Sequence, residues 1–165
     1  MRTKQNKKYA ERGFTLLLAV LVSSVLIALG SAIYDIVSKE IILSSAGRES
    51  QFSFYAADTG IECGLYHDLK NDLFATSSGA TTVTCGGGAP VNLTRTLVSQ
   101  NSPNDTLVTS FTFPIGGSAV TLPCATVTVT RRAYPTSTTI MESLGYNTCD
   151  TANPLRLERA IRVNY

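Results

Sequence analysis

The sequence predicts an α+β fold in which one long N-terminal helix carries a small antiparallel β-sheet head. The first 70 residues keep a helical spacing of apolar side chains, and the chain has no proline before Pro90. Beyond residue 70 the composition shifts to Ser, Thr, Gly, Asn and Pro, and short alternating stretches replace the helical period. The 165 residues allow one ordinary domain and an appendage.

The beginning of the predicted helix is long and apolar enough to cross a membrane. Phe14 to Tyr34 is a run of 21 residues without a charge, about 30 Å of helix at ~1.5 Å per residue. Five of the 14 basic residues lie within the first 13 positions. Because excess Lys and Arg stay on the cytoplasmic side, we expect the N-terminus inside and residues from about 35 onward outside. Without those 13 residues the net charge is −2, which argues against a nucleic-acid-binding domain.

The helix is expected to continue to about residue 70, a total of ~85 Å from residue 14. Residues 35–70 would lie outside the membrane and offer an apolar stripe, with Ala57, Ile61 and Leu65, for the head at 71–165. The clearest predicted strands of that head are 125–131, 138–142 and 155–165, and the weaker ones are 81–85, 92–98, 107–113 and 119–122. A sheet with one packed and one solvated side is expected.

A short motif precedes the apolar run. Arg12-Gly13-Phe14-Thr15-Leu16 places a glycine between the last base of a basic leader and the first apolar residue. Here the chain resembles the type IV pilin and type II secretion pseudopilin family. The resemblance implies that residues 1–13 are a leader, that a prepilin peptidase cuts between Gly13 and Phe14, and that the new amine of Phe14 is methylated. The other reading of the run is an ordinary signal anchor.

One position departs from the family pattern. Most members have a glutamate at the fifth mature position, which here is Leu18. A lone ammonium group in or near lipid costs several kcal/mol unless it is paired. In the family's assembly picture that glutamate pairs with the terminal amine of the subunit ahead. A subunit with Leu18 cannot offer this partner, so the resemblance implies a tip or initiating position. The plainer interpretation is a divergent pilin that tolerates Leu18.

Four cysteines lie beyond the predicted membrane span, where the compartment is oxidising. They allow three pairings, of which sequence neighbourhood favours Cys63–Cys85 and Cys124–Cys149. A zinc site is the rival interpretation, but the ligand spacing does not fit and the chain has one histidine.

Sequence signals of a catalytic site are weak, so we expect that the protein is not an enzyme and has no cofactor. His67 is interpreted as a helix-end histidine near backbone carbonyls, and the 86–88 glycines as a turn. Asp105, with Asn101 and Asn104, is a weak candidate for calcium. The Arg131-Arg132 pair is interpreted as a solvated strand face. Asn92-Leu-Thr and Asn104-Asp-Thr match the glycan acceptor pattern.

The sequence therefore favours a minor pilin or pseudopilin, held in the cytoplasmic membrane by one span and then extracted into a surface filament. The resemblance implies other pilin subunits, prepilin peptidase and an inner-membrane assembly platform as partners. A nucleic acid would be a partner only through a DNA-uptake filament. Two alternatives stay open: a major pilin of a divergent system, and a membrane-anchored surface binding protein. Adhesion, motility, DNA uptake and secretion are not distinguished.

Overall fold

Helix α1 runs without interruption over Gln5–Asn71. It ends close to the predicted residue 70 but begins nine residues before the predicted start at residue 14, within the predicted leader. The computed structural model describes residues 5–75, 78–98, 106–132 and 137–165, with side chains from residue 14 onward. The helix ends at Asn71, and the next residue, Asp72, has a φ of 44°. Aspartate is among the few residues that visit this left-handed region readily, and the amide of Leu73 then donates to the carbonyl of His67.

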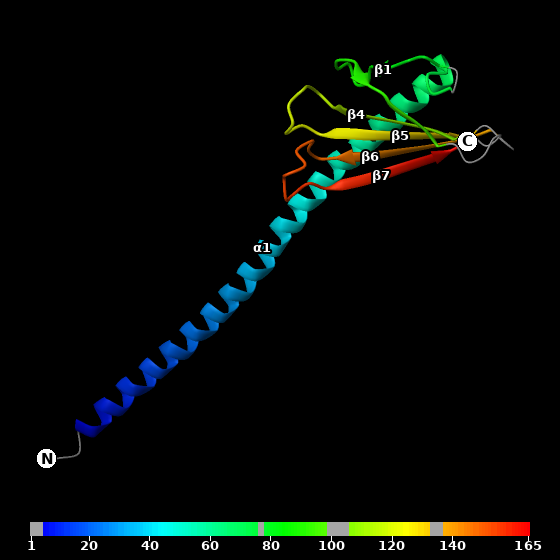
Figure 1. The fold of residues 1–165 in the computed structure, drawn as a ribbon. Helices are drawn as coiled ribbons and strands as arrows, with labels where there is room; N and C mark the ends of the chain where they lie inside the picture. Colours follow the sequence, from blue (N-terminus) through cyan, green and yellow to red (C-terminus); the bar gives the residue numbers. More distant parts are fainter. Residues whose placement is uncertain (1–4, 76–77, 99–105, 133–136) are drawn as a thin grey trace. The chain divides into compact units, whose positions relative to one another are not determined.

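The chain divides into two compact units, residues 1–46 and residues 47–165. The second unit joins the predicted head at 71–165 to the last part of α1. Its described residues form seven strands, which are β1 (Thr82–Val83), β2 (Val91–Asn92), β3 (Thr94–Val98), β4 (Thr106–Pro114), β5 (Cys124–Arg132), β6 (Thr138–Tyr146) and β7 (Glu158–Asn164). β1 and β2 pair with each other, and the others form an antiparallel sheet in the order β3-β4-β5-β6-β7 (Figure 1). This is the predicted α+β architecture.

Two strand predictions are wrong. Residues 119–122 form a turn, closed by the amide of Leu122 donating to the carbonyl of Ala119, and Val120 is exposed. The last strand begins at Glu158 and not at Leu155, because the residues before it form turns. Asn153 accepts the amide of Leu155 and Asn147 accepts the amide of Leu157 through their side chains. Such local side-chain bonds compete with the strand ladder.

The core lies between α1 and the sheet. Small residues lie where the helix and β6 approach each other most closely. Ala56 and Ala57 of α1 are buried, and Gly145 of β6 lies against the helix backbone. Around this contact the core is apolar, with the ring of Phe111 stacked between those of Phe74 and Phe113 at centroid distances of 5.9 and 6.1 Å. The alternating buried residues of β4, β5 and β6 supply the sheet side.

Thr109→Val is expected to stabilise the protein. Thr109 is fully buried in β4, and its hydroxyl has no hydrogen-bond partner among the described residues. Burying an unpaired hydroxyl costs free energy, whereas valine has the same shape without it. We expect the free energy of unfolding to rise by about 1 kcal/mol in chemical denaturation. Thr112→Val is the control, because the Thr112 hydroxyl bonds that of Thr126 at 2.9 Å. A loss of stability in Thr109→Val would contradict the prediction.

Candidate functional site

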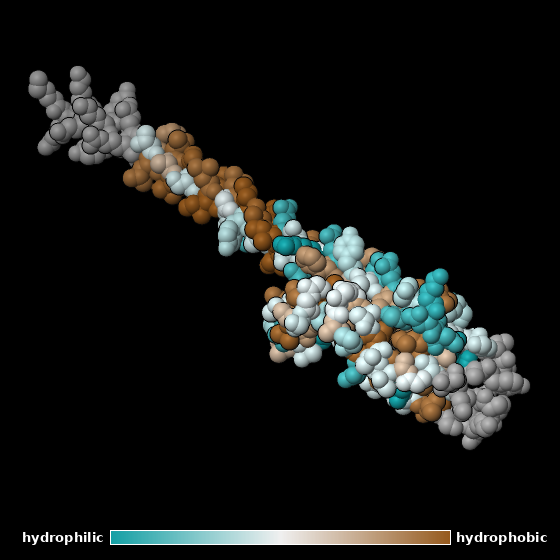
Figure 2. Space-filling model, turned by 90° about the horizontal axis from the view of Figure 1, so that it is seen from above, coloured by the Kyte–Doolittle hydropathy of each residue, from teal (hydrophilic) through white to brown (hydrophobic). Residues whose placement is uncertain are grey.

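The apolar side chains in the first part of α1 are exposed. Its most apolar window has a mean hydropathy of 2.6 and none of it is buried. Large apolar side chains are exposed over residues 14–43, among them Phe14, Leu18 and Leu43 at 69%, 54% and 76%. Figure 2 shows a mostly brown surface over the first part of this stretch, with pale patches within it and teal atoms further along. A helix that is apolar all round and long enough to span a bilayer needs lipid or other helices around it.

The predicted membrane span does not end at a break in the helix. Tyr34, its last residue, is 73% exposed and lies within a helix that continues to Asn71. Exposed apolar side chains also continue past Tyr34 to Leu43, although Asp35 and two further charged residues lie among them. A charged side chain in hydrocarbon is costly, so the charges from Asp35 onward favour a membrane boundary at Tyr34. The helix itself continues through this position. The end of the span at Tyr34 therefore stays a prediction that rests on charge alone.

The polar side chains within this stretch are adapted to such an environment. The hydroxyls of Ser23, Ser24 and Ser31 donate to carbonyls three or four residues earlier, at 2.7–2.9 Å. Satisfied in this way, they leave no unpaired donor to be desolvated in lipid. Ser38 repeats the arrangement with the carbonyl of Asp35. The apolar span is therefore compatible with a membrane by length, composition and hydrogen bonding.

The predicted processing residues lie on this helix. Gly13 and Phe14 are both within α1, so the bond between them is helical in the uncleaved chain. Leu18 is one turn further along, in the i+4 position to Phe14, and its side chain is exposed. The cleavage and the role of Leu18 stay predictions.

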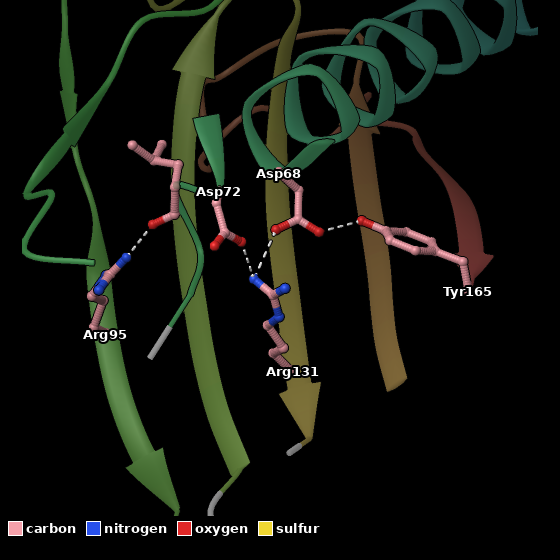
Figure 3. Close-up of polar contacts among 6 residues, drawn as sticks. Asp68, Asp72, Arg95, Arg131 and Tyr165 are labelled. Carbon is pink, nitrogen blue, oxygen red and sulfur yellow. Dashed lines mark hydrogen bonds and ion pairs between the residues drawn. The ribbon is translucent and has the colours of Figure 1, made fainter. Parts of the chain in front are cut away.

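A polar cluster ties the C-terminal end of α1 to the sheet (Figure 3). The carboxylate of Asp68, whose side chain is 3% exposed, accepts a hydrogen bond from the hydroxyl of Tyr165 at 2.6 Å. Its other oxygen lies 3.4 Å from Nη1 of Arg131, which also reaches the carboxylate of Asp72 at 2.8 Å. Arg131 projects inward from β5, so interpreting the Arg131-Arg132 pair as solvated is wrong for Arg131. The alternation of the strand decides which arginine faces the helix.

A second arginine holds the segment that follows α1. The guanidinium of Arg95, on β3, donates to the backbone carbonyls of Leu73 and Ser78. Together with the Asp68 cluster, this contact fixes the helix end and the chain that leaves it against the sheet. No sequence motif distinguishes Asp68, Arg95 or Tyr165. Asp68 lies between His67 and Leu69 in a partly polar stretch, and no local pattern there marks its carboxylate as buried.

Tyr165 predicts a loss of stability at alkaline pH. Burial raises the pKa of the Tyr165 hydroxyl above its ordinary value of 10.0, and the hydrogen bond to Asp68 and the charge of that carboxylate raise it further. A raised folded-state pKa contributes stability that is present below the unfolded pKa and is lost as pH rises beyond it. We expect the free energy of unfolding to fall above about pH 10. Tyr165→Phe should flatten this fall, whereas Tyr66→Phe, at an exposed position, should not. Equal slopes in all three proteins would contradict the prediction.

The predicted Cys63–Cys85 bridge is formed. It joins α1 to the loop after β1 and, in the chain-entropy model, a loop of this size contributes roughly 3 kcal/mol. His67 lies beside it, and the sulfurs and imidazole of the three residues are within 4.8 Å of one another. Because the sulfurs are bonded to each other, they offer no thiolate to a metal. The imidazole contacts the carbonyl of Thr84 and the amide of Asn71, both at 3.1 Å, in agreement with its interpretation as a helix-end histidine.

The second predicted bridge is not formed, and Cys124 and Cys149 are free thiols. The two thiols nevertheless interact, and burial, followed by the interaction with Cys149, raises the pKa of Cys124 to about 12. The amide of Cys149 donates to the carbonyl of Leu122 at 2.9 Å, which holds the two cysteines together. A neutral thiol is a poor nucleophile. Closing this bridge therefore requires an external disulfide oxidant, which the less buried Cys149 attacks and which leaves in reduced form when Cys124 attacks the mixed disulfide.

We expect the Cys124–Cys149 bridge to form in protein secreted into an oxidising compartment. Peptide mapping without reduction should recover a peptide pair joined by these two cysteines, together with the Cys63–Cys85 pair. Cys149→Ser is the control, and it should leave only the Cys63–Cys85 pair. Recovery of Cys124 in alkylated form from the oxidised wild-type protein would contradict the expectation.

Other predicted sites lie mostly on turns or outside the described residues. The candidate calcium residues Asn101, Asn104 and Asp105 lie outside the described part of the chain, as does most of the second glycan acceptor pattern. Asn92, in the first acceptor pattern, is exposed on β2. The 86–88 glycines form the predicted turn, with Gly86 and Gly87 at φ values of 62° and 71° that favour glycine.

No family model, curated protein or solved structure matches this chain. Its function is therefore argued from its own residues, and the geometry defines an α+β protein with one apolar helix long enough to span a membrane.

Proposed function

We propose that this protein is a minor pilin or pseudopilin, a structural subunit of a type IV pilus-like filament. The observation that carries the proposal is the continuity of α1. One helix of 67 residues begins with an exposed apolar stretch, and its last part packs against the five-stranded sheet and is bonded by a disulfide to the loop after β1. A membrane span needs only about 20 residues, so the remaining helix serves another purpose. A filament spine, in which neighbouring apolar helices replace lipid, accounts for the whole length.

The leader adds a second line of support. Five basic residues and Gly13 precede Phe14, in the order expected for a prepilin. A peptidase binds its substrate in an extended form, so the helix must open around the bond between Gly13 and Phe14. Glycine lowers the cost of this opening, because it is about 1 kcal/mol less favourable in a helix than alanine. Gly13 thus permits the helical conformation before the cut and lowers the cost of opening the helix at the cut.

Processing and assembly are tested by mass spectrometry on protein from the membranes and from sheared surface material of the native host. We expect a mature chain that begins with a methylated Phe14, present at low abundance in the sheared fraction. Gly13→Val should abolish the cut, and Gly30→Val, at a helical position with open space around it, should be cut normally. An intact N-terminus found only in membranes would contradict the proposal and favour a membrane-anchored surface protein.

The specific observation that favours a tip position is Leu18. Its side chain is apolar and exposed one turn after Phe14, so it offers no carboxylate to a neighbouring subunit's amine. We expect Leu18→Glu to increase the amount of this protein in the sheared fraction and to spread it along the filament, as seen by immunogold labelling. Leu17→Glu is the control, because it adds the same charge at an adjacent exposed position. High abundance of the unaltered protein along the whole filament would favour a major pilin instead.

A further inference from the structure

The two ends of the Cys63–Cys85 bridge differ in burial. Cys85 is 4% exposed and belongs to the apolar core, whereas Cys63, on α1, is partly exposed. A reagent in solution therefore reaches the bridge from the Cys63 side. A thiolate that attacks one sulfur of a disulfide expels the other, so attack at Cys63 expels Cys85. The sulfur of the buried residue then carries the negative charge.

An imidazole lies beside this bond. His67 follows Cys63 by four residues on α1, so the helix places the two side chains on one face, one turn apart. One ring nitrogen of His67 lies within 4.8 Å of the sulfurs of both cysteines. His67 is itself partly exposed, so the ring exchanges protons with water. The bridge thus has a proton donor and acceptor at its side.

Hydrogen bonds fix the orientation of this ring. Nδ2 of Asn71 lies 3.1 Å from Nδ1 of His67 and donates to it, so the proton of the neutral ring is on Nε2. Nε2 then donates to the carbonyl of Thr84 at 3.1 Å, and the sulfur of Cys63 lies 3.8 Å from the same oxygen. The N–H of His67 and the bridge therefore meet at one carbonyl. An anionic sulfur formed there is a stronger acceptor than this neutral carbonyl.

The packing around the bridge does not depend on its S–S bond. Val83 and Cys85 lie in one apolar cluster with Phe74 and Phe113, and β1 remains paired with β2 through backbone hydrogen bonds. These contacts hold the loop after β1 in place when the bond opens. Both cysteines consequently stay beside His67 in the reduced protein.

We propose that Cys63, His67 and Cys85 form a thiol–disulfide exchange site whose substrate is an external dithiol. One thiolate of the dithiol attacks Sγ of Cys63, the S–S bond breaks, and its electron pair passes to Sγ of Cys85. The imidazolium of His67 gives this sulfur a proton, which the solvent restores to the ring. The second thiol of the dithiol then attacks the dithiol's own sulfur in the mixed disulfide and releases Cys63. Two electrons and two protons thus pass from the dithiol to the bridge.

The contribution of His67 is to the leaving sulfur. A neighbouring imidazolium favours the thiolate form of a cysteine, and a thiol of lower pKa leaves faster in exchange. By microscopic reversibility, the same group also speeds closure of the bridge. The inference goes beyond the proposed function, because it concerns covalent chemistry of the head and not assembly of the subunit.

The test is reduction of the purified, oxidised full-length protein, held in detergent micelles at neutral pH, by excess dithiothreitol. Samples are alkylated at intervals, and peptide mapping follows Cys63 and Cys85 separately from the other cysteines. We expect His67→Ala to slow opening of the bridge about threefold or more. His67→Gln should be equally slow, because its amide can donate to a carbonyl but holds no transferable proton. Leu69→Ala, at an exposed position of the same helix, is the control.

The direction of the effect separates this role from a structural one. If His67 only held the loop in place, its removal would loosen the contact with α1 and expose the bridge. His67→Ala would then open faster than the wild-type protein, and His67→Gln would restore the wild-type rate by keeping the hydrogen bond to Thr84.

The sulfur that is attacked is identified with glutathione, a monothiol, followed by rapid alkylation. We expect the glutathione adduct on Cys63 and the alkylated thiol on Cys85. Equal or faster opening in His67→Ala, a wild-type rate in His67→Gln, or an adduct mainly on Cys85 would each overturn the inference. Because the measurement needs neither leader cleavage nor a filament, its failure is distinguishable from failure of the proposed function.

Discussion

Gly145→Ala is expected to destabilise the head by about 3 kcal/mol or more, the upper end of the range for overpacked cores. A Cβ at Gly145 would overlap the carbonyl oxygen of Ser53 and the backbone nitrogen of Ala57, and would lie 2.8 Å from Cα of Ala57. These are helix backbone atoms, so they cannot move aside without shifting α1 as a whole. The free energy of unfolding, measured by chemical denaturation of the oxidised protein, reports the effect.

Alanine substitutions at two other glycines give reference values for the destabilisation expected in Gly145→Ala. At Gly64 an added Cβ would meet the sulfur of Met141, a flexible side chain, so Gly64→Ala should cost about 1 kcal/mol. Around Gly79 nothing lies within 4 Å, and Gly79→Ala should change the free energy of unfolding by less than about 0.5 kcal/mol. If Gly145→Ala were as stable as Gly79→Ala, the helix and β6 would not approach as closely as described.

Asp68→Ala is expected to destabilise the head by about 3 kcal/mol. Its carboxylate is almost fully buried and accepts bonds from Tyr165 and Arg131, so removal leaves a phenol without its partner and weakens the compensation of the guanidinium. Unfolding should also begin at the end of β7, because Tyr165 is the contact between that end of the chain and α1. Hydrogen exchange at the amide of Tyr165, which donates to the carbonyl of Thr139, reports this local opening.

Comparison of Asp72→Asn with Asp68→Ala separates the effect of carboxylate burial from the effect of the ion-pair distance to Arg131. Asp72 makes the shorter ion pair with Arg131, at 2.8 Å, but its side chain is 68% exposed. Exposed ion pairs contribute about 0–1 kcal/mol, because water already solvates both charges. Asparagine also tolerates the left-handed backbone of this position. A larger loss in Asp72→Asn than in Asp68→Ala would show that the Asp68 carboxylate is not the centre of the cluster.

Much of the fold follows from local patterns. The apolar spacing and the absence of proline predict α1 to within one residue of its observed end, because helix formation depends on neighbours three and four positions away. The alternation in residues 125–131 and 107–113 likewise predicts β5 and β4. The false strand at 119–122 has the same alternation but lies in a turn. Strand pairing is a long-range property, and a short alternating stretch does not reveal whether a partner is available.

The candidate sites divide along the same line. The proposed processing site is visible in the sequence because its parts lie close together there. They are the leader 1–13, which ends in Gly13, then Phe14 and Leu18. The Asp68 cluster joins residues about a hundred positions apart, so it could not be read from spacing in the sequence. Of the two cysteine pairings favoured by proximity in the sequence, the structure forms Cys63–Cys85 and leaves Cys124 and Cys149 as adjacent thiols.

The sequence by itself determined the long apolar helix, the change to a β-rich head at about residue 70 and the leader-like N-terminus, because each rests on composition or on periodicity over a few turns. Only the tertiary structure decided that Arg131 faces α1 and that Gly145 lies where α1 and β6 approach most closely. Those outcomes depend on the packing of α1 against β6 and on strand register, where a shift of one residue would exchange the two faces of a strand.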